Sequence, residues 1–342
     1  MLLDVRGLTS RFYLADGVVR AVEEVSFELA EGESLGIVGE SGSGKTATAM
    51  SLLRLLPPPG RIVSGEIVFE GRDLLGLDDE EMRSIRGGRI AFIPQNPMAA
   101  LNPLFTIGWQ LREALSSHRA LSRNEARTQI VEALHSAGIP EPRTQIDRYP
   151  HEFSGGMRQR ILIAMATLNQ PALLLADEPT TALDTTMQAR ILELIADLVE
   201  RNRMAVVLIT HNMGVVASIC EKVVVMYAGQ VVESGPVGEI FRDPWHPYTR
   251  QLLLATPRLG RRRAGFGVAE GEQPTLTAEP HGCAFRSRCP LAENKCLEMP
   301  ALLDVGGGRS VRCWVAQRDL LAGARIPVAV PSDGSDHGRG PA

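Results

Sequence analysis

Residues 35–46 read Leu-Gly-Ile-Val-Gly-Glu-Ser-Gly-Ser-Gly-Lys-Thr, and this stretch decides the fold. The apolar run 35–38 leads directly into a glycine-rich turn, and residues 47–56 then favour a helix, which the three prolines at 57–59 must end. A strand, a glycine-rich loop and a helix in this order form the phosphate-binding loop, or P-loop. A flexible loop of Gly and Ser is the alternative, and the flanking strand and helix argue against it.

The spacing Gly39-x4-Gly44-Lys45-Thr46 gives each residue a chemical task. Glycines let consecutive backbone N–H groups curl around phosphate oxygens, and the helix that follows presents its positive N-terminus to the same charge. Lys45 would neutralise the β- and γ-phosphates, and Thr46 would hold Mg²⁺. The expected nucleotide ligands of this loop are Gly39, Ser41, Gly42, Ser43, Gly44, Lys45 and Thr46.

Two further apolar runs end in polar residues that suit the same site. The run 173–176 is followed by Asp177 and Glu178. Asp177 suits the coordination of Mg²⁺, and Glu178 can act as the general base on an attacking water. The run 206–210 is followed by His211, at the edge of an open α/β sheet where ligands bind. An acidic turn and a merely structural histidine are the alternatives.

The order of elements along the chain predicts an α/β fold. Short apolar runs alternate with helical stretches, which is typical of a largely parallel sheet with helices on both faces. Residues from about 96 to 154 interrupt this rhythm, because prolines and then helical periodicity indicate an all-helical insert. A hairpin is expected at 222–233, around Ala228-Gly229.

Composition excludes several classes of protein. The chain of 342 residues has 44% hydrophobic and 22% charged residues, which argues against a disordered or fibrous protein. A net charge of −4 offers no global positive field for nucleic acid. The N-terminus lacks the pattern of a secretory signal, and no apolar run reaches the roughly 18 residues of a membrane span.

The five cysteines are unevenly spaced. Cys220 follows an apolar stretch and is expected to be a small buried hydrophobe. The other four, Cys283, Cys289, Cys296 and Cys313, crowd the last sixth of the chain, where they could bind Zn²⁺ or an iron–sulfur cluster or be spare buried thiols. Nearby arginines would offset the charge of a cluster or form an ordinary solvated face, and these are Arg286, Arg288, Arg309 and Arg312.

Residues 153–160 read Phe-Ser-Gly-Gly-Met-Arg-Gln-Arg, and they resemble the signature of ABC-transporter nucleotide-binding domains. The Ser-Gly-Gly core is intact, although Met157 replaces the more usual Gln. Further motifs of that family match in order: the Q-loop at Gln95, the D-loop at 182–184 and the switch histidine at His211. The resemblance implies a P-loop NTPase with a RecA-like core, an antiparallel β subdomain and a helical subdomain.

The resemblance also implies a composite site. In that family two domains sandwich ATP head to tail, so Ser154, Gly155 and Gly156 would reach the γ-phosphate on the partner's P-loop, with Asp184 of the D-loop beside them. An aromatic residue near the N-terminus stacks the adenine, and Tyr13 is expected to do so, with Phe12 as the alternative. The implied catalytic residues are Glu178, His211 and Gln95, and the implied Mg²⁺ ligands are Thr46, Gln95 and Asp177.

A finer resemblance rests on residues 149–152, on residues 246–250 and on the cysteine segment. Together these look like the ATPase subunits of oligopeptide and dipeptide permeases. Such a subunit is peripheral, on the cytoplasmic face of the cell (inner) membrane. It pairs with a second ATPase as a heterodimer, with two transmembrane permeases and with an extracytoplasmic solute-binding protein.

The same resemblance points to a [4Fe–4S] cluster on the four clustered cysteines, with Zn²⁺ as the alternative and with a structural rather than redox role. Three parts of the chain are expected. Residues 1–257 form the nucleotide-binding domain, residues 258–325 the small Cys-rich metal-binding segment, and residues 326–342 a disordered tail.

The leading hypothesis is an import ATPase that hydrolyses ATP to drive uptake of short peptides. The same role for an oligosaccharide or nickel importer is an alternative, because the solute is chosen by partners that the sequence does not contain. A soluble ABC-type ATPase acting on nucleic acid or ribosomes is disfavoured by the net negative charge and the single cassette. An iron–sulfur redox enzyme or sensor lacks any second cofactor motif.

Overall fold

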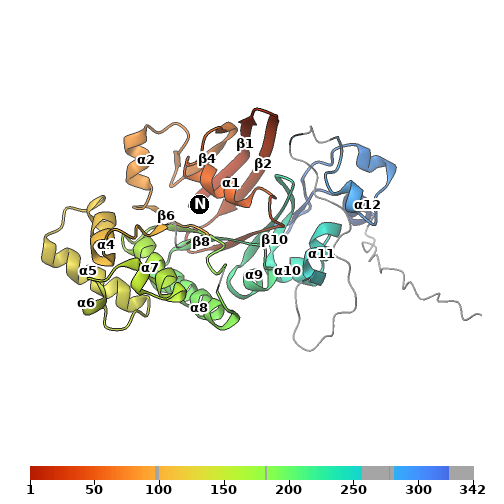
Figure 1. Ribbon diagram of the computed structural model, residues 1–342. Helices are drawn as coiled ribbons and strands as arrows, with labels where there is room; N and C mark the ends of the chain where they lie inside the picture. The colour runs from red at the N-terminus through yellow and green to blue at the C-terminus, as the bar shows by residue number, and fades with distance from the viewer. Residues whose placement is uncertain (97–99, 182, 256–276, 278–280, 323–342) are drawn as a thin grey trace, which may run out of the picture.

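A mostly parallel sheet forms the centre of the molecule. The computed structural model describes residues 1–96, 100–181, 183–255, 277 and 281–322. Eight strands lie in the order β11-β12-β10-β9-β3-β8-β7-β6, between a helical unit and the C-terminal segment (Figure 1). The parallel strands are β3 (Ser34–Val38), β6 (Ile90–Ile93), β7 (Leu173–Asp177), β8 (Ala205–Thr210) and β9 (Lys222–Tyr227).

The side chains of these strands alternate between two hydrophobic cores. Leu35 of β3 packs into the core that also receives helix α1 (Lys45–Leu52). Val38, at the other end of the strand, packs into the core with α8 (Thr185–Asn202) and α9 (Met213–Ile219). Both faces of the sheet are therefore covered, which is why its strands are unbroken apolar runs in the sequence.

A second, antiparallel sheet lies over α1. Its strands, in spatial order, are β2 (Gly17–Leu29), β1 (Leu3–Leu14), β4 (Gly60–Phe69) and β5 (Arg72–Asp73). Helix α2 (Asp79–Ile85) follows, and it begins at a capping box that Asp78 and Glu81 form. This sheet adds Leu3, Leu29 and Phe69 to the core around α1.

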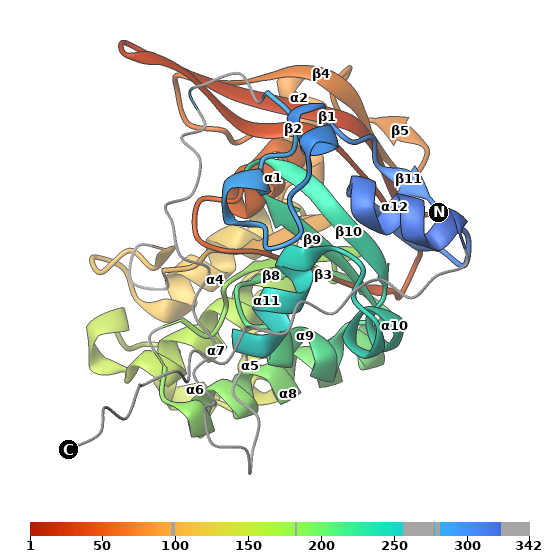
Figure 2. The same cartoon turned by 90° about the vertical axis from the view of Figure 1, so that its right-hand side faces the viewer.

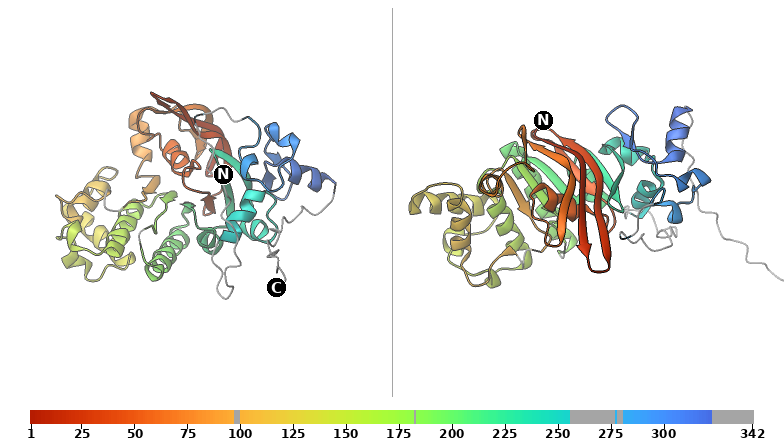
Figure 3. Two further views of the ribbon diagram at one scale, coloured as in Figure 1. Left: turned by 45° about the vertical axis from the view of Figure 1, so that its right-hand side comes forward. Right: turned by 90° about the horizontal axis from the view of Figure 1, so that it is seen from above.

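The helical insert expected at about residues 96–154 packs together with the helix that follows it as a unit with a core of its own. Its helices are α4 (Ile107–Ser116), α5 (Arg123–Ser136), α6 (Pro142–Gln145), η1 (Pro150–Glu152) and α7 (Gly155–Thr167). Leu111, Ile130 and Phe153 are buried together in its centre. Both views in Figure 3 show this unit at one end of the molecule.

The C-terminal part extends the central sheet. Strand β10 (Gln230–Pro236) forms the expected hairpin with β9, and both turn residues, Ala228 and Gly229, have positive φ. Beyond the hairpin come α10 (Val237–Arg242), α11 (Pro247–Ala255), η2 (Arg286–Arg288), η3 (Asn294–Leu297), β11 (Leu303–Asp304), β12 (Ser310–Val311) and α12 (Trp314–Leu321). Strand β12 pairs antiparallel with β10, so the cysteine-containing segment lies against the hairpin (Figure 2).

Some expectations need correction or fall outside the description. Helix α1 ends at Leu52 rather than at residue 56, because Arg54 adopts a left-handed φ of 52°. The predicted tail at 326–342 lies outside the described residues. In the part of the chain that the structure describes, no helix has both the length and the apolar character to cross a membrane.

Candidate nucleotide site

The P-loop runs so close to neighbouring backbone that two of its glycines have no room for a side chain. Gly44 precedes α1 with a φ of 99°, and a Cβ atom there would lie 2.1 Å from the carbonyl oxygen of Ala21. A Cβ atom on Gly39 would lie 2.2 Å from the carbonyl oxygen of Met226. Packing against β2 and β9 therefore fixes the path of the loop.

Lys45 folds back over the loop that it follows. Its Nζ donates hydrogen bonds to the backbone oxygens of Gly39 and Glu40, each at 2.8 Å. Burial lowers the pKa of Lys45, and the nearby carboxylates of Glu178 and Asp177 oppose that effect. The ammonium group thus lies at the centre of the loop, where phosphate oxygens can replace the carbonyls as its partners.

Asp177 and Thr46 meet beside the loop. Asp177 is buried at the carboxyl end of β7, and burial raises the pKa of its carboxyl group, while a hydrogen bond from the Thr46 side chain lowers it in part. A hydroxyl and a carboxylate side by side are the hard oxygen ligands that Mg²⁺ takes, with phosphate oxygens completing the set. The donor set therefore fits a nucleotide-bound Mg²⁺.

Glu178 receives hydrogen bonds from three chain segments. His211 Nδ1 lies 2.9 Å from one carboxylate oxygen, and the other oxygen accepts from Gln95 Nε2 at 2.9 Å and from the Thr181 hydroxyl at 2.8 Å. Burial raises the pKa of Glu178, but the hydrogen bonds from His211 and Thr181, together with the electrostatic effects of His211 and Lys45, leave the pKa below its usual value. Glu178 is therefore ionised at neutral pH, as a group that accepts a proton must be.

The structure thus brings together most of the residues expected at the reaction centre. Gln95 was expected to share Mg²⁺ with Asp177. Its side chain instead donates a hydrogen bond to the neighbouring residue, Glu178. Thr181 was not expected, and its only signal in the sequence is its place three residues after Glu178.

The signature residues lie where the helical insert meets α8. Ser154 is the N-cap of α7, and its Oγ accepts a hydrogen bond from the backbone N–H of Met157 at 3.4 Å. Gly155 is exposed, whereas a Cβ atom on Gly156 would meet the sulfur of Met187 at 2.8 Å. Asp184 caps α8 in the same way, so both motifs stand at helix N-termini.

The two candidate adenine-stacking aromatics differ in their surroundings. Tyr13 is 46% exposed, near the turn of the β1–β2 hairpin. Phe12 is partly buried and packs against the core that contains α1. The residue preferred in the sequence analysis is thus the more exposed of the two.

The four clustered cysteines are neighbours, but they do not form a site for one ion. The backbone N–H of Cys283 donates to the carbonyl of Cys296 at 2.9 Å. Burial raises the pKa of Cys283 to about 11 and that of Cys289 to about 12. Among the described residues, no three side chains of His, Cys, Asp or Glu are placed to hold a metal ion. The described residues therefore show no single-ion metal site. Cys296 and Cys313 are buried, as Cys220 is, and Cys283 and Cys289 are partly buried against the core around α8 and α9.

For three of the four arginines of this segment, the structure speaks against one of the two alternatives, the solvated face. Arg288, Arg309 and Arg312 are buried rather than a solvated face. Arg309 pairs with the fully buried Glu233 at 3.2 Å, and Arg312 donates to the backbone oxygen of Val231 at 3.0 Å. Their partners belong to the ATPase core, so these arginines dock the segment onto it.

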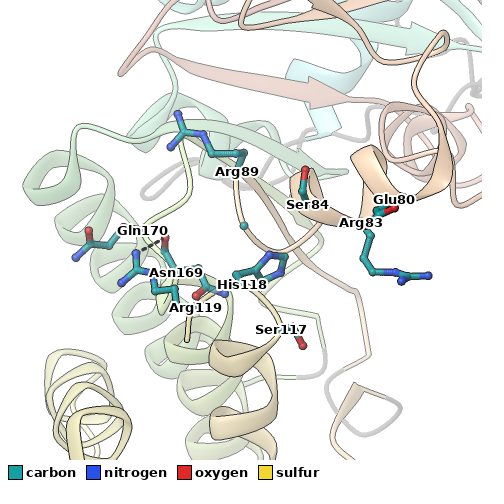
Figure 4. A pocket seen from close by; sticks show the side chains of 10 residues that line it. Glu80, Arg83, Ser84, Arg89, Ser117, His118, Arg119, Asn169 and Gln170 are labelled. Atoms are coloured by element: carbon teal, nitrogen blue, oxygen red, sulfur yellow. Dashed lines mark hydrogen bonds between the residues drawn. The ribbon is translucent and has the colours of Figure 1, made fainter. Parts of the chain in front are cut away.

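A separate pocket of about 590 Å³ lies between α2 and the helical insert (Figure 4). It is lined by Glu80, Arg83, Ser84, Gly88, Arg89, Ser117, His118, Arg119, Asn169 and Gln170. None of the motif residues belongs to this lining, so the pocket is distinct from the candidate nucleotide site.

Two families match the chain in tandem. The family described as ABC transporter matches residues 22–181, and the one described as oligopeptide/dipeptide transporter, C-terminal region, matches residues 232–296. A dimeric ATP-binding cassette in a post-hydrolysis state, bound to ADP and Pi, superposes with a TM-score of 0.62 at 29% identity, covering 69% of this chain and 99% of that one.

Curated relatives match nearly the whole chain. A probable peptide ABC transporter ATP-binding protein of Sinorhizobium fredii is 49% identical, covering 92% of this chain and 95% of the relative. The oligopeptide transport ATP-binding protein OppD of Salmonella typhimurium is 46% identical, covering 94% and 96%. The chain therefore belongs to the ABC transporter family, as an ATPase. Within that family it is similar to the ATP-binding proteins of oligopeptide and dipeptide transport, which confirms the resemblance seen in the sequence.

Proposed function

We propose that this chain hydrolyses ATP to drive the import of oligopeptides or dipeptides. The observation that carries the proposal is the meeting of Lys45, Asp177, Glu178, Gln95 and His211, from separate segments, at one edge of the sheet. The similarity to peptide transport subunits over more than nine-tenths of the chain supports a peptide rather than an oligosaccharide or nickel as the solute.

Each group has a task in the reaction that we propose. The backbone N–H groups of the P-loop and Lys45 bind the β- and γ-phosphates of ATP. Thr46 and Asp177 would hold Mg²⁺, which neutralises charge on those phosphates. The Glu178 carboxylate accepts a proton from the attacking water, while Gln95 and His211 orient the carboxylate and the water.

Adenine would stack on an aromatic side chain of β1. Phe12 is the better candidate, because it packs on the side of the strand that faces the core around α1. Tyr13 remains the alternative that the sequence analysis preferred.

The proposed assembly follows from the signature. Ser154, Gly155, Gly156 and Asp184 lie at helix N-termini, which favour contact with phosphate, and they would reach ATP on the P-loop of a second ATPase subunit. Two such subunits, two transmembrane permeases and an extracytoplasmic solute-binding protein complete the transporter. The chain would then sit at the cytoplasmic face of the membrane, with residues 1–257 as its nucleotide-binding domain and 258–325 as its C-terminal segment.

We propose further that the four clustered cysteines bind a [4Fe–4S] cluster. Four thiols in one small segment are the donor set of such a cluster, and the backbone hydrogen bond from Cys283 to Cys296 brings two of these residues together. A cluster spans more space than one ion. Anaerobically purified protein should contain about four Fe per chain. Cys289→Ser should remove the iron and Cys220→Ser should not, and protein without iron would refute the assignment.

Transport is tested with the assembled complex in vesicles. ATP-driven uptake of a labelled dipeptide is expected for the unaltered chain and should disappear with Lys45→Ala, because the β- and γ-phosphates lose their cation. Lys222→Ala, at a half-exposed lysine outside the P-loop, is the matched control. Undiminished binding of a fluorescent ATP analogue to the Lys45 variant would contradict the site, and uptake of nickel instead of peptide would contradict the solute.

A further inference from the structure

The P-loop residue Glu40 is paired with an arginine from the far end of the chain. Arg288, in the cysteine segment, donates from both terminal nitrogens to the two carboxylate oxygens, at 2.9 and 3.0 Å. The Arg288 side chain is 4% exposed and that of Glu40 is 27% exposed. A two-pronged, mostly buried pair of this kind combines strong hydrogen bonds with fixed geometry.

Aromatic side chains hold Arg288 in place. Tyr227 accepts a hydrogen bond from Arg288 at 3.3 Å, and the guanidinium carbon lies 5.8 Å from the centre of its ring. Phe285, three residues before Arg288, is fully buried and packs edge-on against Tyr227, with ring centres 5.2 Å apart. The hydroxyl of Tyr248 in α11 accepts from the backbone N–H of Glu40 at 2.8 Å. Glu40 is therefore fixed through its carboxylate and through its backbone.

The contact with Arg288 matters because Glu40 carries a negative charge close to where phosphates would bind. Glu40 belongs to the loop that would surround a triphosphate, and its backbone oxygen accepts from Lys45. A carboxylate without a cation in that loop would repel the phosphates and compete with them for the ammonium group. Arg288 supplies the neutralising charge, and it comes from outside the parts of the chain that carry the nucleotide motifs.

We propose that Arg288 is a positioning residue for ATP, through which the C-terminal segment sets the nucleotide affinity of the P-loop. The segment is then a component of the nucleotide site and not an appendage to it. This inference rests on the proposed function, because it requires that a nucleoside triphosphate binds at the P-loop.

The test measures the affinity of the full chain for a fluorescent ATP analogue. Arg288→Gln should raise the Kd about tenfold, as expected for the loss of a charge-assisted pair. The double variant Arg288→Gln, Glu40→Gln should recover to within about threefold of the unaltered chain, since the repelling charge is gone. Arg318→Gln, at an exposed arginine of the same segment that pairs with Glu293, should bind like the unaltered chain.

The outcomes separate this inference from the proposed function. If the unaltered chain binds no ATP, the proposed function fails. If it binds ATP and Arg288→Gln binds equally well, or if Glu40→Gln restores nothing, only the inference is overturned. Where Arg288→Gln is too unstable to purify, Arg288→Lys decides: in the assembled complex it should raise KM for ATP about threefold at unchanged kcat, because it keeps the charge and loses the paired geometry. An unchanged KM would overturn the inference.

Discussion

Glu178 occupies a left-handed backbone conformation with a φ of 45°, directly after the last residue of β7. Such a conformation costs a non-glycine residue about 1–3 kcal/mol, so the surroundings must impose it. Its backbone N–H donates to the carbonyl of Ile209 at 2.8 Å, and its carboxylate has three side-chain partners. Strain of this kind is typical of functional positions, and here it turns the carboxylate from the strand toward Gln95 and His211.

We expect Glu178→Gln to bind ATP normally but to lower turnover by about 10²–10⁴-fold, because the amide cannot accept the proton of water. Phosphate release by the assembled complex measures turnover, and a fluorescent ATP analogue measures binding. Glu193→Gln, at an exposed glutamate of α8, is the matched control. Turnover that equals that of the control would remove Glu178 from the role of base.

His246 makes stability depend on pH. The ring is fully buried, its Nδ1 accepts the backbone N–H of Tyr248 at 3.1 Å, and burial lowers its pKa to about 3. The unfolded chain takes up this proton near pH 6.5 and the folded chain does not, so this contribution to stability is complete above pH 6.5 and is lost as the pH falls towards 3.

The replacement His246→Asn should therefore reduce the loss of stability between pH 7 and pH 5 by about 2 kcal/mol. Urea unfolding at the two pH values measures this difference. The buried Glu233, which accepts the backbone N–H of His246, is present in both proteins and serves as the common background. An unaltered pH dependence would mean that His246 is protonated in the folded state.

At the scale of elements, a substitution at the N-terminus of α7 can change ATP hydrolysis without changing the stability of the fold. The helix needs a cap at residue 154, and Asp caps a helix about as well as Ser does. We expect Ser154→Asp to leave the unfolding midpoint of the chain unchanged and its ATP affinity intact. It should abolish hydrolysis in the assembled complex, because the new charge would face the phosphates of the partner's nucleotide.

Ser154→Ala is the comparison variant. It should also impair hydrolysis, because it removes a hydroxyl that would reach the partner's phosphate, but unlike Ser154→Asp it should lower the unfolding midpoint. It removes the cap, at a cost of about 1 kcal/mol, without adding charge. Full hydrolysis by a complex that carries Ser154→Asp would show that this helix end does not face phosphate.

The helices and strands themselves were predictable where the sequence carries one clear pattern of apolar or turn residues. The strands β3, β7 and β8 are buried on both faces, and the β9–β10 hairpin carries its turn residues in the sequence. By contrast, β1 and β2 are long strands in which polar and charged residues interrupt the apolar ones. Their outer halves expose residues such as Arg20 and Tyr13 in part, so no unbroken apolar run marks them.

At the scale of the whole molecule, the nucleotide motifs were predictable from the sequence. The distant residues that pair with them were not. Each motif combines residue types with a local spacing that the chemistry requires, so residues 39–46, 177–178 and 211 could be chosen without a structure. The pairing of Glu40 with Arg288 joins residues 248 positions apart. Nothing local marks such a contact, because it depends on how β12 and the cysteine segment pack against the hairpin.

The docking of the C-terminal segment should be costly to break. Arg309 pairs with Glu233, and its guanidinium carbon lies 3.3 Å from the ring centre of Trp245. Arg309→Met would leave a buried carboxylate without its cation, a change that costs roughly 3–5 kcal/mol. Urea unfolding measures the loss. Arg318→Met, at an exposed pair, should unfold at the same urea concentration as the unaltered chain, and equal midpoints for both variants would argue against a docked segment.

The pairing of Glu40 with Arg288 also has a consequence for how the protein is made. Ribosomes synthesise the chain from its N-terminus, so the P-loop emerges from the ribosome long before Arg288 does. At about 5–20 residues per second, the 248 residues that follow Glu40, up to and including Arg288, take roughly 12–50 s to synthesise. Once His211 has been made, the growing chain carries every nucleotide motif, but for the next 77 residues (288 − 211) it lacks the cation that Arg288 supplies. Newly made chains would therefore gain full affinity for ATP only as translation ends, when the rest of the subunit is ready to assemble.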